Sequence, residues 1–214
     1  PMPEAPSASG TVRLAIRWPA NARNTQMIPN SSRVLDFRLI QANQTVATAS
    51  LRFPETQVLL GPVASGPSRI EAQAYHDSQP PSPLWGPEQL VATGSIDVVV
   101  VANRNVNAAL TLAPTRVPVL ASLDPPQGLV GRTVIIWGSH LKAPRGGGTR
   151  LFINGTELSA SQFQVFDNRV IIPTLPDQGD ALNLSLIVDG VDGNQTLTYQ
   201  VIRVGSLSLS PTVL

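Results

Sequence analysis

The chain contains no cysteine among its 214 residues. It therefore forms no disulfide, has no thiolate nucleophile and offers no cysteine ligand to zinc. Charged residues make up only 14% of the chain and the formal net charge is +1, so no strong field attracts nucleic acid or anionic lipid. No stretch approaches the roughly 18 to 20 consecutive apolar residues that a membrane-spanning helix needs. We therefore expect neither a nucleic-acid partner nor a membrane span.

Signatures of catalysis and of metal binding are also scarce. The two histidines, His76 and His140, lie far apart, and no GxSxG, HExxH or paired-carboxylate pattern occurs. The run DGVDGN at residues 189–194 offers oxygen ligands of the kind that calcium prefers. It lacks the bidentate glutamate of an EF-hand, however, and Asp-Gly is also a hairpin-turn sequence. We interpret this run as a turn and expect no catalytic residue, no metal site and no cofactor.

Glycine and proline are abundant, with 16 and 20 residues, and they separate many short runs of alternating apolar and polar residues. This pattern is typical of an all-β chain, and no useful length shows helical periodicity. In the first half the alternation predicts strands over residues 11–18, 34–40, 45–53, 57–60, 70–75, 90–92, 95–101 and 106–112.

The predicted strands fall into two groups, which indicates two tandem immunoglobulin-like β-sandwich domains. The polar, proline-rich opening suggests a linker before the first group, and APTRV at residues 113–117 is a natural hinge because it is short and lies between the two groups. The predicted organisation is a linker over 1–10, a sandwich over 11–112, a hinge over 113–117, a second sandwich over 118–204 and a tail over 205–214.

The second group opens with a strand, a turn and a further strand over residues 118–141. The first strand is predicted over 119–123, and Gln127-Gly128 supplies the turn. In the next strand Val134 and Ile136 alternate with Ile135 and Trp137, and Gly138 is predicted to end it. Later strands are predicted over 149–154, 163–166, 169–172, 180–188 and 197–201, with tight turns at Asn154-Gly155 and Asp167-Asn168.

This order of residues over 118–204 resembles an IPT/TIG domain, which has an immunoglobulin-like β-sandwich fold. In that pattern the residues equivalent to Val134 and Ile136 point into the core, which implies that Ile135 and Trp137 lie on the outer face. Residues 11–113 more weakly resemble transthyretin-like or fibronectin-like bacterial extracellular modules, and this second resemblance implies a fold and no site. Folds of this type serve many functions, so the function has to be argued from a site.

Two groups of residues are candidates for contact with a ligand or partner. Trp85 lies in the proline-rich segment 80–87, with Tyr75 and His76 at its base, where it would present a flat apolar ring. Alternatively, Trp85 folds back to plug the end of the sandwich. Ile135 and Trp137 are two large apolar side chains on an outer face. We therefore predict that the first domain or a neighbouring chain packs over them. The alternative is an uncovered and partly exposed tryptophan.

The sequence thus predicts a non-catalytic interaction or spacer module of a bacterial cell-surface or secreted protein. The predicted location is extracytoplasmic, and a lipoprotein is one form that such a protein takes. A second hypothesis is a carbohydrate-binding accessory unit of a polysaccharide-degrading system, with Trp85 or Trp137 as the stacking surface. The partner is accordingly a protein or a polysaccharide, and further domains of a longer chain are possible. A removed signal or a lipid anchor before Pro1 would fit the opening segment.

Overall fold

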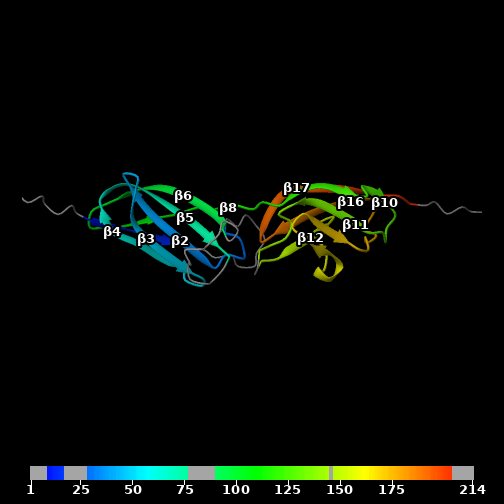
Figure 1. Cartoon of the computed structure of the whole chain (residues 1–214), viewed down its shortest axis with the longest axis horizontal. Coiled ribbons are helices and arrows are strands. Elements are labelled where there is room, and N and C mark those ends of the chain that lie inside the picture. The colour runs from blue at the N-terminus through cyan, green and yellow to red at the C-terminus, as the bar shows by residue number, and fades with distance from the viewer. Residues whose placement is uncertain (1–8, 17–27, 77–89, 145–146, 204–214) are drawn as a thin grey trace, which may run out of the picture. The chain divides into compact units, whose positions relative to one another are not determined.

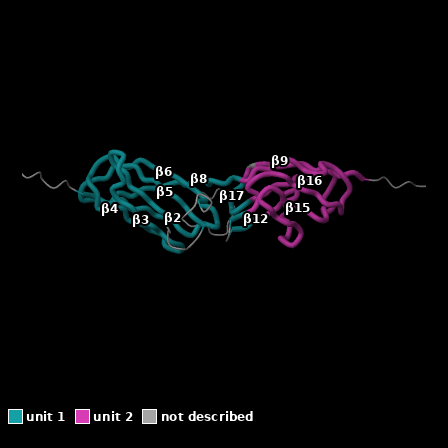
Figure 2. The backbone as a smooth tube through the Cα atoms, in the orientation of Figure 1, with its two compact units in different colours: residues 1–117, 143–149, 188–192 teal, residues 118–142, 150–187, 193–214 magenta. Residues whose placement is uncertain are grey.

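A computed structural model describes residues 9–16, 28–76, 90–144 and 147–203. The chain divides into two compact units (Figure 2). Unit 1 comprises residues 1–117 together with the short segments 143–149 and 188–192, and unit 2 comprises 118–142, 150–187 and 193–214. Four β-sheets account for the described strands, so the chain is all-β with two sandwich-like bodies, as the sequence predicts.

Unit 1 contains a five-stranded sheet in the order β3-β2-β5-β6-β8 and a three-stranded sheet in the order β4-β1-β7 (Figure 1). The larger sheet is antiparallel throughout, whereas β1 pairs in parallel with β7. The strands are β1 (Ser9–Ala15), β2 (Val34–Gln41), β3 (Gln44–Arg52), β4 (Gln57–Ala64), β5 (Gly66–Tyr75), β6 (Leu90–Val100), β7 (Asn105–Ala108) and β8 (Ala113–Pro114).

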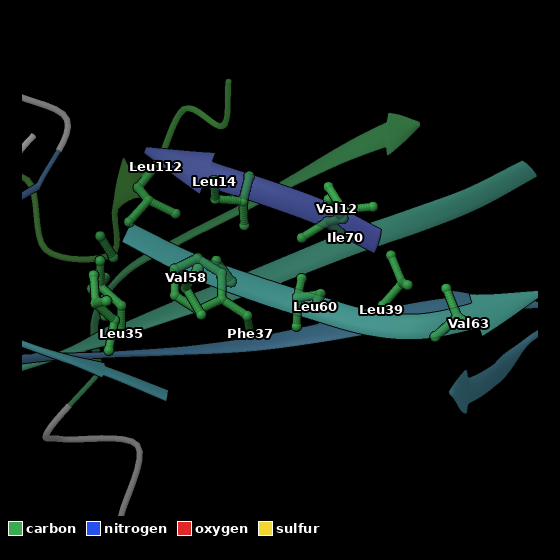
Figure 3. Close-up of a cluster of buried hydrophobic side chains, with 14 of the residues drawn as sticks. Val12, Leu14, Leu35, Phe37, Leu39, Val58, Leu60, Val63, Ile70 and Leu112 are labelled. Atoms are coloured by element: carbon green, nitrogen blue, oxygen red, sulfur yellow. The ribbon is translucent and has the colours of Figure 1, made fainter. Parts of the chain in front are cut away.

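The core of unit 1 follows from the alternation within its strands. In β2 the side chains of Leu35, Phe37 and Leu39 are buried, whereas Arg38 between them is exposed. Val12 and Leu14 of β1 are also fully buried, and they belong to the same cluster (Figure 3). Burial of each such side chain contributes about 1.5 to 3 kcal/mol, so this cluster holds the two sheets of unit 1 together.

Unit 2 carries most of two further sheets, in the orders β14-β15-β11-β9 and β10-β17-β16-β12-β13. Its first sheet contains β9 (Val119–Asp124), β11 (Val134–Ser139), β14 (Gln164–Val165) and β15 (Arg169–Ile172). The second contains β10 (Gln127–Gly128), β12 (Thr149–Ile153), β13 (Thr156–Glu157), β16 (Ala181–Val188) and β17 (Val191–Val201). A short 3-10 helix spans Ala160–Gln162. None of the described helices is long and apolar enough to cross a membrane.

Alternation also builds the core of unit 2. Val134 and Ile136 of β11 are fully buried, as are Val170 and Ile172 of the neighbouring strand β15. The opposite sheet contributes the buried leucines at alternate positions of β16, Leu182, Leu184 and Leu186. The inward residues of β11 are therefore those that the IPT/TIG resemblance implies.

Several details of the strand and turn predictions were wrong. Gln127-Gly128 is not the predicted turn but a short strand, β10, which pairs in parallel with β17. The strand predicted over 106–112 ends at Ala108. Residues 90–92 and 95–101 form one strand, β6, because its pairing with β5 runs without interruption through Gly94. Gly138 does not end β11, since the pairing with β9 shifts register there and continues to Ser139. The turn predicted over 189–194 is confined to Asp189 and Gly190, which both have positive φ, and β17 begins at Val191.

Candidate binding surface on unit 2

The first predicted contact group lies only partly within the described residues. Tyr75 and His76 lie at the end of β5 and are partly buried. The Tyr75 hydroxyl donates to Oε1 of Gln73 at 2.7 Å. Burial raises the pKa of Tyr75, and the negative charge of Asp36 acts in the same direction. Trp85 lies outside the described residues, so its grouping with Tyr75 and His76 stays a prediction.

The second predicted group lies on the outer face of β11. The side chains of Ile135 and Trp137 are partly exposed, whereas those of Val134 and Ile136, which alternate with them, are inaccessible to solvent. The cause is the two-residue period of a strand, which directs successive side chains to opposite faces. The predicted outward direction of Ile135 and Trp137 therefore agrees with their positions.

The pairing register places further residues beside this pair. Trp137 pairs with Arg169 of β15 on one side and with Ser122 of β9 on the other. Phe166 follows β14, and its backbone N–H donates to the carbonyl of Arg169 at 2.8 Å. Directly paired residues of neighbouring strands lie on the same face. Together they form one row across the sheet, in the order Phe166, Arg169, Trp137, Ser122.

A second row of paired residues lies on the same face, two residues away from the first row along each strand. Ile135 pairs with Ile171 and with Asp124, and Ile171 pairs in turn with Gln164. We call the two rows the Arg169 platform, which consists of Phe166, Arg169, Trp137, Ser122, Gln164, Ile171, Ile135 and Asp124. Arg169, Trp137, Ile171 and Ile135 lie at its centre, and its margins carry Phe166 and the polar residues Gln164, Ser122 and Asp124.

Arg169 is held between the two aromatic rings of the first row. Its Cζ atom lies 4.5 Å from the centroid of the Phe166 ring and 5.8 Å from that of Trp137. A guanidinium over an aromatic ring is stabilised by about 0.5 to 1 kcal/mol at an exposed site. Among the described residues its guanidinium makes no hydrogen bond and no ion pair. The rings thus orient the N–H donors of Arg169, and no described residue accepts a hydrogen bond from them.

Two other described arginines also lie over aromatic rings, and both have hydrogen-bond acceptors. Arg33 lies 5.5 Å from the centroid of Phe53, and its Nη1 donates to the carbonyls of Asn30 and Ser32. Arg150 lies 5.0 Å from the centroid of Phe152 and donates through two nitrogens to the carboxylate of Glu157. The hydrogen bond to Glu157 raises the pKa of Arg150. Arg169 differs from both in having stacking contacts alone.

Sequence reasoning found Trp137 and Ile135 but missed Phe166 and Arg169. The signal was present, because Asp167-Asn168 was recognised as a tight turn. Residues that flank a two-residue turn face each other across the hairpin. The turn therefore places Phe166 opposite Arg169, and Trp137 joins them only through the pairing of β15 with β11.

A buried carboxylate in unit 1 has a different character. Asp189 is 4% exposed, and its carboxylate accepts hydrogen bonds from the Ser31 backbone N–H at 2.7 Å and from the Ser31 hydroxyl. Burial raises the pKa of Asp189, although the Ser31 hydrogen bonds and the positive charges of Arg33 and His76 act in the opposite direction. Within the described ranges no three metal-ligating side chains gather. Asp189 therefore joins segments of unit 1 and has the geometry of a structural group.

No protein-family model matches the chain, so the assignment of residues 118–204 to the IPT/TIG family stays a prediction. No curated protein matches it.

Among solved structures, the chain is similar to the fimbrial anchor protein Mfa2 from Porphyromonas gingivalis, with 11% identity, 83% of this chain and 78% of that chain covered, and a TM-score of 0.35. It is similar to murine CEACAM1b, with 10% identity, coverages of 84% and 89%, and a TM-score of 0.31. It is also similar to the Bacteroides ovatus mixed-linkage glucan utilization locus protein SGBP-B, with 13% identity, 88% of this chain and 44% of that chain covered, and a TM-score of 0.28. These are distant likenesses of the β-sandwich fold.

Proposed function

We propose that this chain is a non-catalytic interaction module of a bacterial surface or secreted protein, and that the Arg169 platform is its contact surface. The observation that supports this proposal is the row of Phe166, Arg169 and Trp137 on one sheet face. Its two rings are exposed or partly exposed, and within the described ranges its guanidinium has no hydrogen bond and no ion pair. Aromatic and arginine side chains are the types that contribute most to binding at interfaces. Rigid antiparallel sheets hold such a row in a fixed geometry.

The non-catalytic part of the proposal is supported by the chemistry of the platform. Catalysis by proton transfer or nucleophilic attack needs a titratable or nucleophilic group within hydrogen-bond reach of a second one. On the platform the ionisable side chains are Arg169 and Asp124, which lie on strands separated by β11. Two strand spacings put them about 10 Å apart, which is too far for such a pair.

Carbohydrate binding is the second candidate, and the composition of the platform favours it. Sugar rings combine apolar C–H faces, which pack on aromatic rings, with hydroxyls that need donors and acceptors. The platform provides Trp137 and Phe166 for the first, and Ser122, Gln164 and Asp124 at its margins for the second. A sugar-binding module of this kind would act as an accessory unit beside an enzyme.

The test is retention of the full chain on a panel of soluble and insoluble polysaccharides, run with Trp137→Ala and Trp85→Ala. Phe152→Ala is the matched control, because Phe152 also stacks with an arginine but lies on the other sheet. We expect retention of the unaltered chain and of F152A, and loss of retention in W137A. Release of reducing ends, measured in the same samples, should stay at background.

The other outcomes are equally informative. Loss of retention in W85A alone would move the site to the segment 80–87 and would contradict the platform. Absence of retention for every form would reject carbohydrate binding and leave a spacer, whose length and stiffness are its function. Reducing ends that rise with protein concentration would make the chain an enzyme.

A further inference from the structure

We propose that the Arg169 platform binds an acidic polysaccharide, and that Arg169 receives a uronate carboxylate of the sugar chain. This inference rests on the proposed function, since it names the ligand of the same surface.

The first argument is the state of the Arg169 guanidinium. A guanidinium has five N–H donors in a planar fork, which matches the two oxygens of a carboxylate. Phe166 and Trp137 contact Arg169 through their rings, and rings do not use the donors at the edge of the guanidinium. Stacking also limits the positions that the side chain adopts, so less entropy is lost when a ligand binds. The platform therefore holds an oriented cation with unused donors.

The second argument comes from Arg150, which shows the same arrangement with its carboxylate present. Arg150 also stacks on a ring, that of Phe152, and Glu157 accepts two hydrogen bonds from its guanidinium, one of them 2.8 Å from Nε. Charge-assisted, two-point pairing of this kind is about twice as strong as a neutral hydrogen bond. At Arg169 the residue in the register position of Glu157 is Gln164, which carries an amide instead of a carboxylate, because Gln164 pairs with Ile171 as Glu157 pairs with Phe152. An external carboxylate would complete at Arg169 the pair that Glu157 completes at Arg150.

The third argument is the size of the surface, which favours a thin chain over a globular partner. The rows cross four strands, about 14 Å, and lie about 7 Å apart along the strands. Eight residues make up this strip, whereas a stable protein interface takes about 20 to 30 residues on each partner. A polysaccharide chain lying along the row of Phe166, Arg169 and Trp137 needs only a strip of this size. The polar margins then face its hydroxyls.

The experiment compares polygalacturonate with the same polymer after complete methyl esterification, which keeps the sugar chain and removes the charge. Binding of the full chain is measured by titration calorimetry at low salt and again in 0.5 M NaCl. We expect polygalacturonate to bind at least about tenfold more tightly than the ester, because a hydrogen bond to a charged group contributes about 1.5 to 3 kcal/mol. High salt should weaken this binding, since the pair is partly exposed.

Variants assign the effect to the residue. Arg169→Gln should lose at least about tenfold of the affinity for polygalacturonate and little for the ester. Arg169→Lys keeps the charge without the fork and should fall between the two. Arg150→Gln is the matched control and should bind as the unaltered chain does. Thermal unfolding of each variant checks that it folds.

Equal affinity for polygalacturonate and its methyl ester would overturn the inference that the ligand is acidic. Unchanged affinity of R169Q for polygalacturonate would overturn it as well. If W137A still lost binding in that case, the proposed function would stand and the ligand would be neutral. Equal losses in R150Q and R169Q would show a general effect of positive charge and would also overturn the inference. Failure of polygalacturonate to bind at all would overturn it, whatever the neutral polysaccharides do.

Discussion

The two sheets of unit 2 each hold an arginine against an aromatic ring, and they differ in what completes the pair. On one sheet Phe152 of β12 pairs with Glu157 of β13, which brings a carboxylate to Arg150. On the other, the β14–β15 hairpin brings Phe166 to Arg169. The same stacking contact is thus accompanied by an ion pair in one hairpin, which we call a closed pair. In the other hairpin no described carboxylate joins it, which we call an open pair. A cation that is stacked on rings, with no carboxylate paired to it in the described part of the chain, is a candidate for binding a ligand.

The largest expected effect concerns the two faces of β11. Ile136→Ala should lower the free energy of unfolding of unit 2 by about 2 to 4 kcal/mol, because it opens a cavity in the core. Ile135→Ala, one residue away on the platform, should cost less than about 1 kcal/mol, because its side chain is partly exposed. Urea unfolding measures both values. Similar costs for the two substitutions would contradict the assignment of an inner and an outer face.

The second prediction uses a carboxylate that the chain itself has paired. Asp189→Ala should destabilise unit 1 by about 1 to 3 kcal/mol, because the buried backbone N–H of Ser31 loses its acceptor. Asp189→Asn keeps an acceptor for that N–H and should cost much less. Thermal unfolding distinguishes the two variants. Equal destabilisation by both would show that the charge of Asp189, and not its acceptor atoms, holds the segments together.

The same residue predicts a pH dependence. The pKa of Asp189 is raised above its ordinary value of 3.8, so the folded chain binds this proton more tightly than the unfolded chain. Its contribution to stability is therefore fully present below pH 3.8 and is lost as the pH rises through the raised pKa. Unfolding free energies of the unaltered chain minus those of D189N should decline over that window. Parallel curves would contradict the raised pKa.

The third prediction closes the open pair at Arg169. Gln164 lies on β14, two residues before Phe166 and diagonal to Arg169 across the β14–β15 pair. Gln164→Glu places a carboxylate within reach of the guanidinium, as Glu157 is for Arg150. We expect stability to change by less than about 1 kcal/mol and affinity for polygalacturonate to fall at least about tenfold. Unchanged affinity would show that Arg169 does not receive the carboxylate.

The smallest effect is expected from the opposite change. Glu157→Gln opens the pair at Arg150, whose partners are 39% and 44% exposed, and should cost at most about 1 kcal/mol. Affinity for polygalacturonate should rise slightly or stay the same, because the opened site has one ring, that of Phe152, instead of two. Calorimetry of E157Q beside the unaltered chain measures this. A gain as large as the loss in Q164E would show that one ring suffices.

Much of the fold was predictable because alternation and turn chemistry are local. Alternation predicted the strands over 134–137 and 180–188, and the IPT/TIG resemblance implied that Val134 and Ile136 point inward. Val134, Ile136 and the alternate leucines of β16 are buried. Predictions were wrong where hydrogen bonding overrides side-chain pattern. Gly138 lacks the side chain that continues an alternation, yet its backbone still pairs with β9 after a shift of register.

The candidate site shows the same division. The residue pattern alone put Ile135 and Trp137 on the face opposite Val134 and Ile136 and predicted a tight turn at Asp167-Asn168, because a strand has a period of two and a turn has local residue preferences. The IPT/TIG resemblance implied which of the two faces points outward. The position of β15 beside β11, in the register that stacks Arg169 between Phe166 and Trp137, follows from long-range packing alone. Register between strands distant in sequence depends on how both pack onto one core. No local pattern contains that information.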